Sequence, residues 1–435
     1  MDLRTLTTAV HWRWNAFRRS YSTRARTAAT FLWRRMMVRT VFIVISGSVG
    51  KTTTKELLRE VLSPHGGAVA TIGNWNHRKN GGLENTVLRV RPWHRFAVIE
   101  AAIERPGDLA PVARLVKPDI GVMLAVKRCH TKMFPTEEAI AREKGELIRN
   151  LGRRGRAVLN LDDPRVAAMA AAAPGEVVWF GSGQEARIRL LESRSRWPDR
   201  LRLRIAAHGR EYQVHTRLVG THWTTAVLAT LATADACGIA LEDAIARLGD
   251  VEPFWARMQP VTLPGSGAVL IRDEWNGSFD TFEAAFNVME EADAVRKGVI
   301  VSDYSDTPTK MRTRALRLGR WAAQFAQLLV FVGDYAERSV AAAVEAGVPG
   351  ESVHGFATLP PAIAFLKREL RRGDLVLLKG QTSHHLSRIY LGLLGEIDCT
   401  VLSCGRQHLC DKCERLGLER RPELDGLVAA TDSPR

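Results

Sequence analysis

The sequence predicts an α/β protein with two successive domains, each built on a mostly parallel sheet. An apolar run at 41–45 leads through a glycine-containing turn into a helical pattern that starts near Lys51. Short apolar runs then alternate with helical patterns, which is typical of parallel sheets with crossover helices. The chain has 435 residues, more than one ordinary core accommodates.

The first domain is expected to hold strands at 41–45, 96–99, 120–124 and 157–159. Residues 185–218 differ, because apolar and polar residues alternate there around Leu201, Leu203 and Ile205, as in an antiparallel excursion. Residues 224–248 are Ala-rich and helical in pattern. These features predict one central domain over 41–258.

A second α/β pattern follows, with strands expected at 269–271, 298–301, 328–332 and 375–378. We place the domain boundary near 258–262, around Pro260 and Pro264. The predicted ranges are a basic amphipathic N-terminal helix at 1–40, a central domain at 41–258, a second domain at 259–395 and a cysteine-containing tail at 396–435.

The net charge of +15 is concentrated at the start, where residues 1–40 hold nine Arg and one acid, Asp2. An apolar stripe at helical spacing runs through the same segment, formed by Leu3, Leu6, Val10, Trp14, Phe17 and Tyr21. This fits an interfacial helix on anionic lipid, a helix docked on a partner or on the protein itself, or an organellar transit peptide. The remainder is only mildly basic, so no nucleic-acid partner is expected.

The chain shows neither a secretory signal nor an apolar run long enough to span a bilayer, and its cysteines are few. We therefore expect a cytoplasmic protein in a reducing compartment, with the inner membrane face as an alternative location. Four of the six cysteines lie close together in the tail: Cys399, Cys404, Cys410 and Cys413. Their C-x4-C-x5-C-x2-C spacing suggests a structural zinc site, and the alternative is a set of unliganded thiols.

The segment Ser46-Gly47-Ser48-Val49-Gly50-Lys51-Thr52-Thr53-Thr54 has the composition of a phosphate-binding loop. Its glycines let backbone N–H groups turn toward a phosphate, the following helix adds a positive N-terminus, and Lys51 adds a full charge. Thr52 can hold Mg²⁺ through its hydroxyl. The longer P-loop pattern has a glycine where Ile45 stands, so the match is to the shorter G-x-x-G-K-T-T form.

With this loop the sequence resembles the Mur ligase family, in particular its D-alanyl-D-alanine-adding branch, over roughly residues 41–390. Further segments agree in order and spacing. They are Gly73-Asn74-Trp75-Asn76, Ile99-Glu100 with Pro106-Gly107-Asp108-Leu109, His130 with Phe134, Lys144-Gly145-Glu146, Asn160-Leu161-Asp162-Asp163-Pro164, Gly220-Thr221-His222, Arg257-Met258-Gln259, Asp273-Glu274-Trp275-Asn276 and Lys379-Gly380.

The resemblance implies a P-loop ATPase domain followed by a Rossmann-like domain, with ATP and Mg²⁺ as cofactors. It implies that Gly47, Ser48, Gly50, Thr53 and Lys51 hold the phosphates, and that Thr52 and Glu100 bind the first Mg²⁺. His130 and a carbamylated Lys144 would bind the second Mg²⁺, because a carbamate supplies the hard oxygens that Mg²⁺ prefers. Arg257 and Asp273 would reach the γ-phosphate and ribose, and His222 and Asn276 would lie beside the nucleotide.

The sequence departs from the family where Ala125, Trp223 and Ala226 stand in place of asparagines, which puts the adenine contacts in doubt. Residues 77–86 are longer and more polar than the corresponding family segment. Only 40 residues precede the first strand, so we expect no N-terminal UDP-sugar domain and a substrate other than UDP-MurNAc-peptide.

The sequence thus predicts an ATP-dependent ligase that couples a small-molecule or peptidic carboxylate to an amine through an acyl phosphate. We expect the second domain to close onto the first about a hinge near 258–264. The alternative is a non-catalytic nucleotide-binding subunit of a larger ligase or envelope complex. A P-loop ATPase acting on nucleic acid would need basic stripes beyond residue 40, which the sequence lacks.

Overall fold

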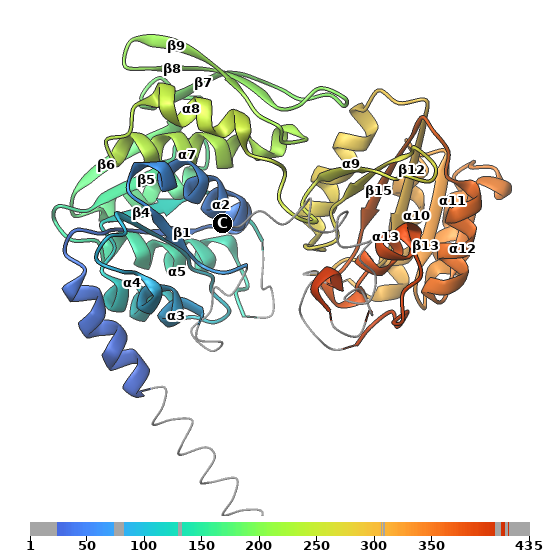
Figure 1. Cartoon of the computed structure of the whole chain (residues 1–435), viewed down its shortest axis with the longest axis horizontal. Helices are drawn as coiled ribbons and strands as arrows, with labels where there is room; N and C mark the ends of the chain where they lie inside the picture. Colours follow the sequence, from blue (N-terminus) through green and yellow to red (C-terminus); the bar gives the residue numbers. More distant parts are fainter. Residues whose placement is uncertain are drawn as a thin grey trace, which may run out of the picture. The chain divides into compact units, whose positions relative to one another are not determined.

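The computed structural model describes residues 24–73, 82–128, 133–305, 307, 309–404, 410–413 and 416. The chain forms two compact units (Figure 1). Unit 1 comprises residues 1–192, 204–214 and 224–249, and unit 2 comprises residues 193–203, 215–223 and 250–435. The predicted boundary at 258–262 lies inside unit 2. None of the described helices is long and apolar enough to cross a bilayer.

Unit 1 is built on a nine-stranded sheet with the order β2-β3-β1-β4-β5-β6-β7-β8-β9. Neighbouring strands from β2 to β7 pair in parallel. Their bounds are β1 Val41–Ser46, β2 Ala68–Ala70, β3 Phe96–Glu100, β4 Ile120–Met123, β5 Arg156–Asn160, β6 Glu176–Gly181, β7 Ile188–Arg194, β8 Arg202–Ala207 and β9 Arg210–His215.

Helices cover both faces of this sheet (Figure 1). They are α2 Lys51–Leu62, α3 Gly82–Arg89, α4 Leu109–Val116, α5 Glu137–Arg149, α6 Pro164–Ala167, α7 Thr224–Ala236 and α8 Leu241–Asp250, with 3₁₀ turns η1 Ser63–His65, η3 Ala168–Ala172 and η4 Thr221–Trp223. Phe42 and Val44 of β1 belong to a core shared with α3, α4 and α5. Because side chains alternate along a strand, Ile43 and Ile45 face the opposite side of the sheet.

Strands β8 and β9 are joined by His208 and Gly209 alone. Both residues have positive φ, 49° and 74°, as a tight hairpin turn requires. A two-residue connection can join only antiparallel strands, so this hairpin matches the excursion predicted for residues 185–218. The buried side chains of Leu203 and Ile205 alternate with more exposed ones along β8.

Unit 2 has a six-stranded sheet with the order β10-β11-β15-β12-β13-β14, parallel except for the β10–β11 pair. The strands are β10 Gln259–Thr262, β11 Val269–Arg272, β12 Arg296–Val301, β13 Leu328–Val332, β14 Val353–Phe356 and β15 Asp374–Lys379. The helices are α9 Phe279–Glu291, α10 Met311–Ala322, α11 Ala336–Glu345, α12 Leu359–Glu369 and α13 Ser387–Leu394, with 3₁₀ turns η5 Gly350–Ser352, η6 Thr382–His384 and η7 Cys410–Lys412. The predicted α/β class with two parallel-dominated sheets is confirmed.

The described residues of the predicted tail are packed into unit 2. Cys410, Cys413 and Leu416 are buried in the same core as Ile389 and Tyr390 of α13. The tail therefore contributes to the core of this unit, which its polar, cysteine-containing sequence did not suggest.

Candidate active site

The phosphate loop connects β1 to α2, and two of its glycines are required by the backbone. Gly50 caps the N-terminus of α2 with φ 80°, in the left-handed region. Gly47 has φ 154°, and a Cβ there would lie 3.0 Å from the Cβ of Leu124. Side chains at these positions would be strained, so the loop needs glycine to keep its shape.

Ser48 forms hydrogen bonds that connect the phosphate loop to residues 125–127, which follow β4. Its backbone N–H donates to the carbonyl of Ala125 at 2.8 Å. Its hydroxyl donates to the carbonyl of Lys127 and accepts from the Lys127 N–H, both at 2.9 Å. In this structure the hydroxyl of Ser48 thus has a structural role, which phosphate binding alone would not require.

Two lysine ammonium groups meet at one carbonyl of the loop. Lys51 Nζ donates to the carbonyls of Gly47 at 2.7 Å and Ser48 at 3.1 Å. Lys144, on α5, is 1% exposed, and its Nζ donates to the same Gly47 carbonyl at 2.9 Å. Two cations beside a helix N-terminus create a strongly positive site suited to phosphate groups.

Thr52 and Glu100 come together at the same edge of the sheet. Glu100 ends β3, which pairs with β1 so that Ile45 lies beside Glu100. The Thr52 hydroxyl donates to Glu100 Oε1 at 3.1 Å. A hydroxyl and a buried carboxylate offer the hard oxygen ligands that Mg²⁺ prefers, so these residues fit the predicted metal. The hydroxyl of Thr53 is buried without a hydrogen-bond partner among the described residues.

The location follows from the sheet order. Strand β1 lies between β3 and β4. The connection after β1 runs to β2 on one side, whereas the connection after β3 runs past β1 to β4 on the other side. Open α/β sheets bind ligands at the carboxyl end of strands where the strand order switches. The loop, Glu100 and Lys144 gather there.

Three predicted features fall outside the described residues. They are the apolar stripe from Leu3 to Tyr21, the residues Asn74, Trp75 and Asn76 of the G-N-x-N segment, and His130, the proposed ligand of a second Mg²⁺. Their predicted roles stay predictions.

The sequence analysis missed two buried charged groups that shape this site. Lys55 is fully buried, and its Nζ donates to the carbonyls of Thr71 and Gly73, both at 2.7 Å. Glu143, directly before Lys144, accepts from the backbone N–H groups of Gly107 at 2.8 Å and Leu109 at 2.9 Å. The sequence held a signal for both groups, because Lys55 directly follows the phosphate-loop segment and Glu143 directly precedes Lys144.

In unit 2 the predicted residue Asp273 forms a buried ion pair with Lys379, at the ends of β11 and β15. Asp273 also accepts from the Met258 N–H at 3.0 Å, and Lys379 Nζ donates to the carbonyl of Asn276 at 2.9 Å. Burial raises the pKa of Asp273 and lowers that of Lys379, and each partner opposes the shift of the other. The Asp273–Lys379 pair therefore connects the three predicted segments 257–259, 273–276 and 379–380.

Arg257 lies between two residues with left-handed backbone. Ala256 has φ 50° and Met258 has φ 48°, a conformation that costs side-chain-bearing residues roughly 1–2 kcal/mol each. Hydrogen bonds hold both, from Trp275 N–H to the Ala256 carbonyl at 3.2 Å and from Met258 N–H to Asp273. Strain maintained in this way is typical of functional segments. The charge of Arg257 acts on both Asp273 and Lys379.

His222 and Trp223 are neighbours in unit 2, with ring centroids 4.4 Å apart. Burial, with a smaller effect from the Lys379 charge, lowers the pKa of His222 to about 3. Its Nδ1 and the Trp223 Nε1 are buried without hydrogen-bond partners among the described residues. At neutral pH His222 is therefore uncharged and presents polar ring atoms. Ala226, at the second departure from the family pattern, is buried in α7.

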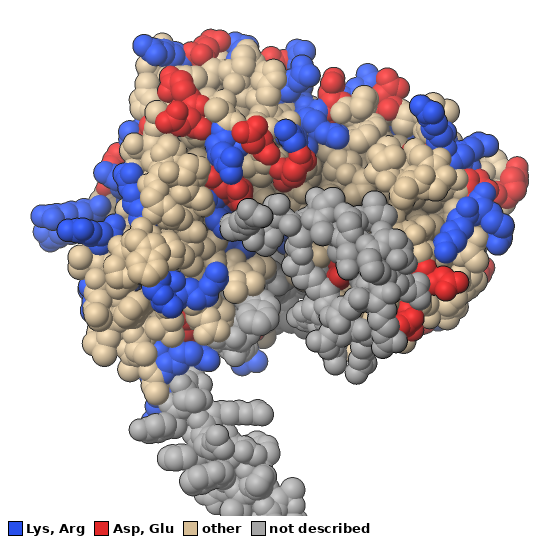
Figure 2. Space-filling view, viewed as in Figure 1, with Lys and Arg blue, Asp and Glu red and all other residues tan. Residues whose placement is uncertain are grey.

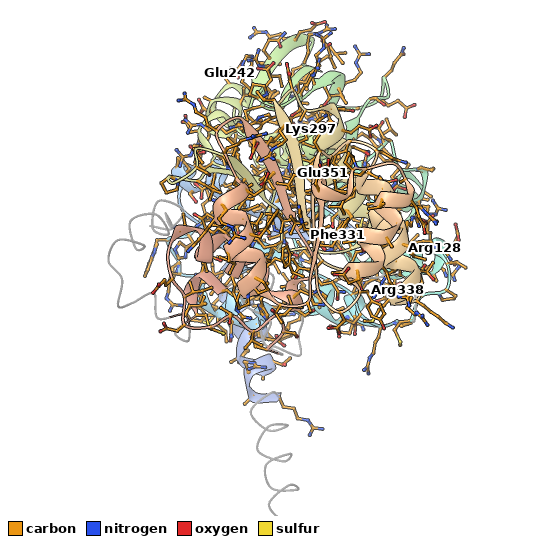
Figure 3. The ribbon with its side chains drawn as sticks, turned by 90° about the vertical axis from the view of Figure 1, so that its right-hand side faces the viewer. Arg128, Glu242, Lys297, Phe331, Arg338 and Glu351 are labelled. Carbon is orange, nitrogen blue, oxygen red and sulfur yellow. The ribbon has the colours of Figure 1, made fainter. Side chains whose placement is uncertain are left out.

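A cavity of about 270 Å³ lies at the carboxyl ends of β12 and β13 in unit 2. Phe331 of β13 lines it and lies within the packed side chains (Figure 3). Its lining includes Asp303, Asp334, Tyr335 and His384, which are titratable. Asp303 pairs with Arg314, and burial raises its pKa despite that pairing. The Ser302 hydroxyl and His384 Nδ1 have no hydrogen-bond partner among the described residues, so a polar ligand fits here.

The predicted zinc ligands are not gathered into a metal site among the described residues. Instead His385 lies between two of the thiols, with its Nε2 3.3 Å from Cys404 Sγ and its Nδ1 3.3 Å from Cys410 Sγ. Burial raises the pKa of Cys410 to about 12, so this thiol is protonated at neutral pH. The two thiols thus contact opposite nitrogens of one imidazole ring.

In a comparison with known protein families, residues 45–234 match the Mur ligase middle domain. Among curated relatives, the chain is 31% identical over 378 residues to the UDP-N-acetylmuramoyl-tripeptide–D-alanyl-D-alanine ligase of Mycobacterium tuberculosis (strain CDC 1551 / Oshkosh), covering 82% of this chain and 73% of the relative. The corresponding ligase of Escherichia coli (strain K12) is 25% identical over 299 residues, covering 67% and 64%.

Solved structures with a similar fold include two MurF ligases. Crystal structure II of MurF from Acinetobacter baumannii aligns with a TM-score of 0.78 at 23% identity, covering 86% of this chain and 80% of that one. MurF ligase from Thermotoga maritima in complex with ADP aligns with a TM-score of 0.73 at 20% identity, covering 86% and 83%.

Proposed function

Because the chain belongs to the Mur ligase family of ATP-dependent, amide-bond-forming enzymes, we propose that it joins a carboxylate to an amine through an acyl phosphate. One observation supports this most directly. Lys51 and Lys144 converge on the Gly47 carbonyl beside the Thr52–Glu100 pair. A phosphate loop carrying two cations and hard oxygen ligands is suited to a transferring phosphoryl group.

In the proposed reaction a carboxylate oxygen of the acid attacks the γ-phosphorus of ATP, and the bond to the β-phosphate oxygen breaks to release ADP. The amine nitrogen then attacks the acyl carbon, phosphate leaves, and the amine loses a proton. Lys51 and the loop N–H groups hold the β- and γ-phosphates, with Thr53 beside them. Water must be kept out, because it would hydrolyse the acyl phosphate.

Thr52 and Glu100 would hold Mg²⁺, which when bound neutralises charge on the phosphates. We propose His130 and a carbamylated Lys144 as the ligands of a second ion. The unmodified Lys144 is a cation that contacts the loop, whereas carbamylation would replace this positive charge by an anionic carbamate whose oxygens can bind Mg²⁺.

For unit 2 we propose that Arg257, Asp273, Asn276 and His222 serve the nucleotide. The support is the convergence of their segments on the Asp273–Lys379 pair and the strained backbone around Arg257. Closure of the second domain during catalysis stays a prediction, and scattering with and without ATP and substrate tests it.

We place the amine substrate in the cavity of unit 2. Asp303 and Asp334 offer carboxylates to an ammonium group, and Arg314 beside Asp303 offers a partner to a substrate carboxylate. A free amino acid or short peptide carries both groups. Asp303→Asn should raise KM for the amine with little effect on KM for ATP, whereas Glu345→Gln, on the exposed Arg320–Glu345 pair, should change neither.

For the acid, the curated relatives support UDP-N-acetylmuramoyl-tripeptide, with D-alanyl-D-alanine as the amine. Residues 77–86, which favoured a different acid, are described only from Gly82 onward. The relatives' pair is therefore the first to assay, followed by a panel of other acids and amino acids. A structural zinc in the tail stays a prediction that elemental analysis tests.

The proposal is tested by phosphate release in the presence of ATP, Mg²⁺, acid and amine. Lys51→Ala should lose at least about a hundredfold in kcat, because the loop loses its fixed cation. Arg114→Ala, an exposed arginine on α4, is the matched control and should keep full activity. Full activity in a folded Lys51→Ala protein would contradict the ligase proposal.

A further inference from the structure

A surface of unit 1 combines exposed apolar side chains with arginines. Residues 24–36 form a helix, and its inward side packs on the domain: Trp33 Nε1 donates to the Val90 carbonyl at 2.9 Å, and Arg34 donates to the Val116 carbonyl at 2.6 Å. Met37, just beyond, is buried. The helix is thus anchored to the domain by one side.

The outward side is apolar. Phe31, Leu32 and Met36 are 41%, 63% and 64% exposed, and their spacing places them on one side of the helix. The guanidinium of Arg35 lies over the Phe31 ring, 3.1 Å from its centroid. A long cationic side chain that covers an aromatic ring while its charge reaches solvent is typical of a membrane interface.

Two loops next to the helix carry further exposed apolar side chains. Val38 is 83% exposed and Trp93 is 73% exposed. Their loops are adjacent, because Thr40 Oγ1 donates to the His94 carbonyl at 2.7 Å and the Val41 N–H donates to the Arg95 carbonyl at 2.8 Å. We call the combined surface the basic apolar face. It consists of Phe31, Leu32, Met36, Val38 and Trp93 with Arg35, Arg39, Arg91 and Arg95.

The charged residues of this face are all arginines, and the acid Asp119 pairs with Arg34 on the inward side of the helix. Residues 24–40 contain five Arg, residues 88–95 contain three, and neither segment contains an acid. Figure 2 shows the same distribution on the visible side of unit 1, where red side chains gather in the upper part and the lower left is tan and blue. An apolar surface rimmed by arginines is complementary to a bilayer rich in anionic lipid.

We propose that the basic apolar face docks on the surface of an anionic membrane, with Leu32, Met36, Val38 and Trp93 entering the headgroup region and the arginines pairing with lipid phosphates. Tryptophan favours this interfacial depth because one side of its ring system is apolar and its N–H is polar. The proposal concerns only unit 1 and does not depend on which substrates the enzyme joins.

The experiment is co-sedimentation of the full chain with vesicles of phosphatidylglycerol and phosphatidylcholine, compared with vesicles of phosphatidylcholine alone. We expect binding to the anionic vesicles that weakens with salt. The double variant Leu32→Asn with Met36→Asn should lower the partition coefficient about tenfold, because it removes apolar contact without adding charge. Arg35→Gln with Arg39→Gln should lower it about 25-fold, since one basic residue contributes about fivefold.

The matched control is Val295→Asn with Val344→Asn, two exposed valines of unit 2, which should bind vesicles as the unchanged chain does. All variants should keep ATP-dependent phosphate release, since none of these residues lies in the proposed active site. Equal binding to neutral and anionic vesicles, or no loss in either face variant, would overturn the proposal. A face variant that instead converts a dimer to a monomer would also overturn it, because the face would then bind a second copy.

Discussion

Lys144 Nζ donates to the carbonyl of Gly47 at 2.9 Å, although 97 residues separate the two in sequence. Lys144 is nearly fully buried on α5, and Gly47 opens the phosphate loop after β1. A buried ammonium is costly unless it is paired and hydrogen-bonded. Its position under the loop is therefore better explained by the anion that this loop is built to bind than by packing.

Replacing this lysine gives the first prediction. Lys144→Ala should reduce kcat for phosphate release by at least about a hundredfold, because the site loses a group that contacts the loop and a proposed metal ligand. If Lys144 is carbamylated, adding a short carboxylate or high bicarbonate should restore part of the activity of Lys144→Ala, because these anions supply oxygens that can bind Mg²⁺. Arg142→Ala, an exposed change on the same helix, is the control. Normal kcat in folded Lys144→Ala would refute the assignment.

The second prediction concerns Lys55. Lys55→Met keeps the apolar stem but leaves the carbonyls of Thr71 and Gly73 without their donor, at a cost of about 1–3 kcal/mol in unfolding free energy. We expect faster hydrogen exchange at 71–73 and a raised KM for the acid, with KM for ATP less affected. Arg59→Met, which breaks partly exposed ion pairs on the same helix, should cost under about 1 kcal/mol. If Lys55→Met and Arg59→Met lowered the unfolding free energy equally and changed KM for the acid equally, the hydrogen bonds from Lys55 to residues 71 and 73 would have no particular importance.

The third prediction concerns the tail. Arg272 is fully buried, and its guanidinium pairs with Glu274 and, at 2.8 Å, with Asp411. Asp411→Asn leaves a buried cation with one partner fewer, so chemical unfolding should show a loss of about 3–5 kcal/mol. The exposed Arg320–Glu345 pair is the control, and Glu345→Gln should cost under about 1 kcal/mol. A similarly small loss in Asp411→Asn would mean that the tail does not stabilise unit 2.

The fourth prediction is a pH dependence from His222. Its pKa is about 3 in the folded protein against an ordinary value of 6.5, so between these values the unfolded chain binds a proton that the folded chain does not. The free energy of unfolding should therefore fall as pH drops from about 6.5 toward 3, and should not depend on this residue above that window. Lys379, whose charge acts on His222, reinforces the shift.

The measurement compares urea unfolding of the unchanged chain and of His222→Gln at about pH 7.5 and about pH 5. The stability difference between the two proteins should move in favour of the variant at the lower pH. His215→Gln, at an exposed histidine, is the control and should show no such change. An unchanged difference for His222→Gln would contradict the burial of a neutral ring.

The sequence by itself determined the local elements of this protein. The apolar run before Ser46, the glycines at 47 and 50, and Lys51 with Thr52 predict a strand, a phosphate loop and a helix, because each depends on neighbours within a few residues. The alternation of strands and helices predicted the parallel sheets in the same way. The ordered motifs predicted the family, which the comparisons confirm.

Only the tertiary structure decided which distant groups meet. No sequence spacing places Lys55 on the carbonyls of residues 71 and 73, His385 between Cys404 and Cys410, or Asp411 on Arg272. The physical reason is that a buried polar group takes whichever partner the folded core brings within hydrogen-bond distance, and strand order and helix packing set that distance. The tail shows this clearly: its cysteine spacing predicts a zinc site, which stays a prediction, but no spacing predicted that its side chains join a core and a buried ion pair.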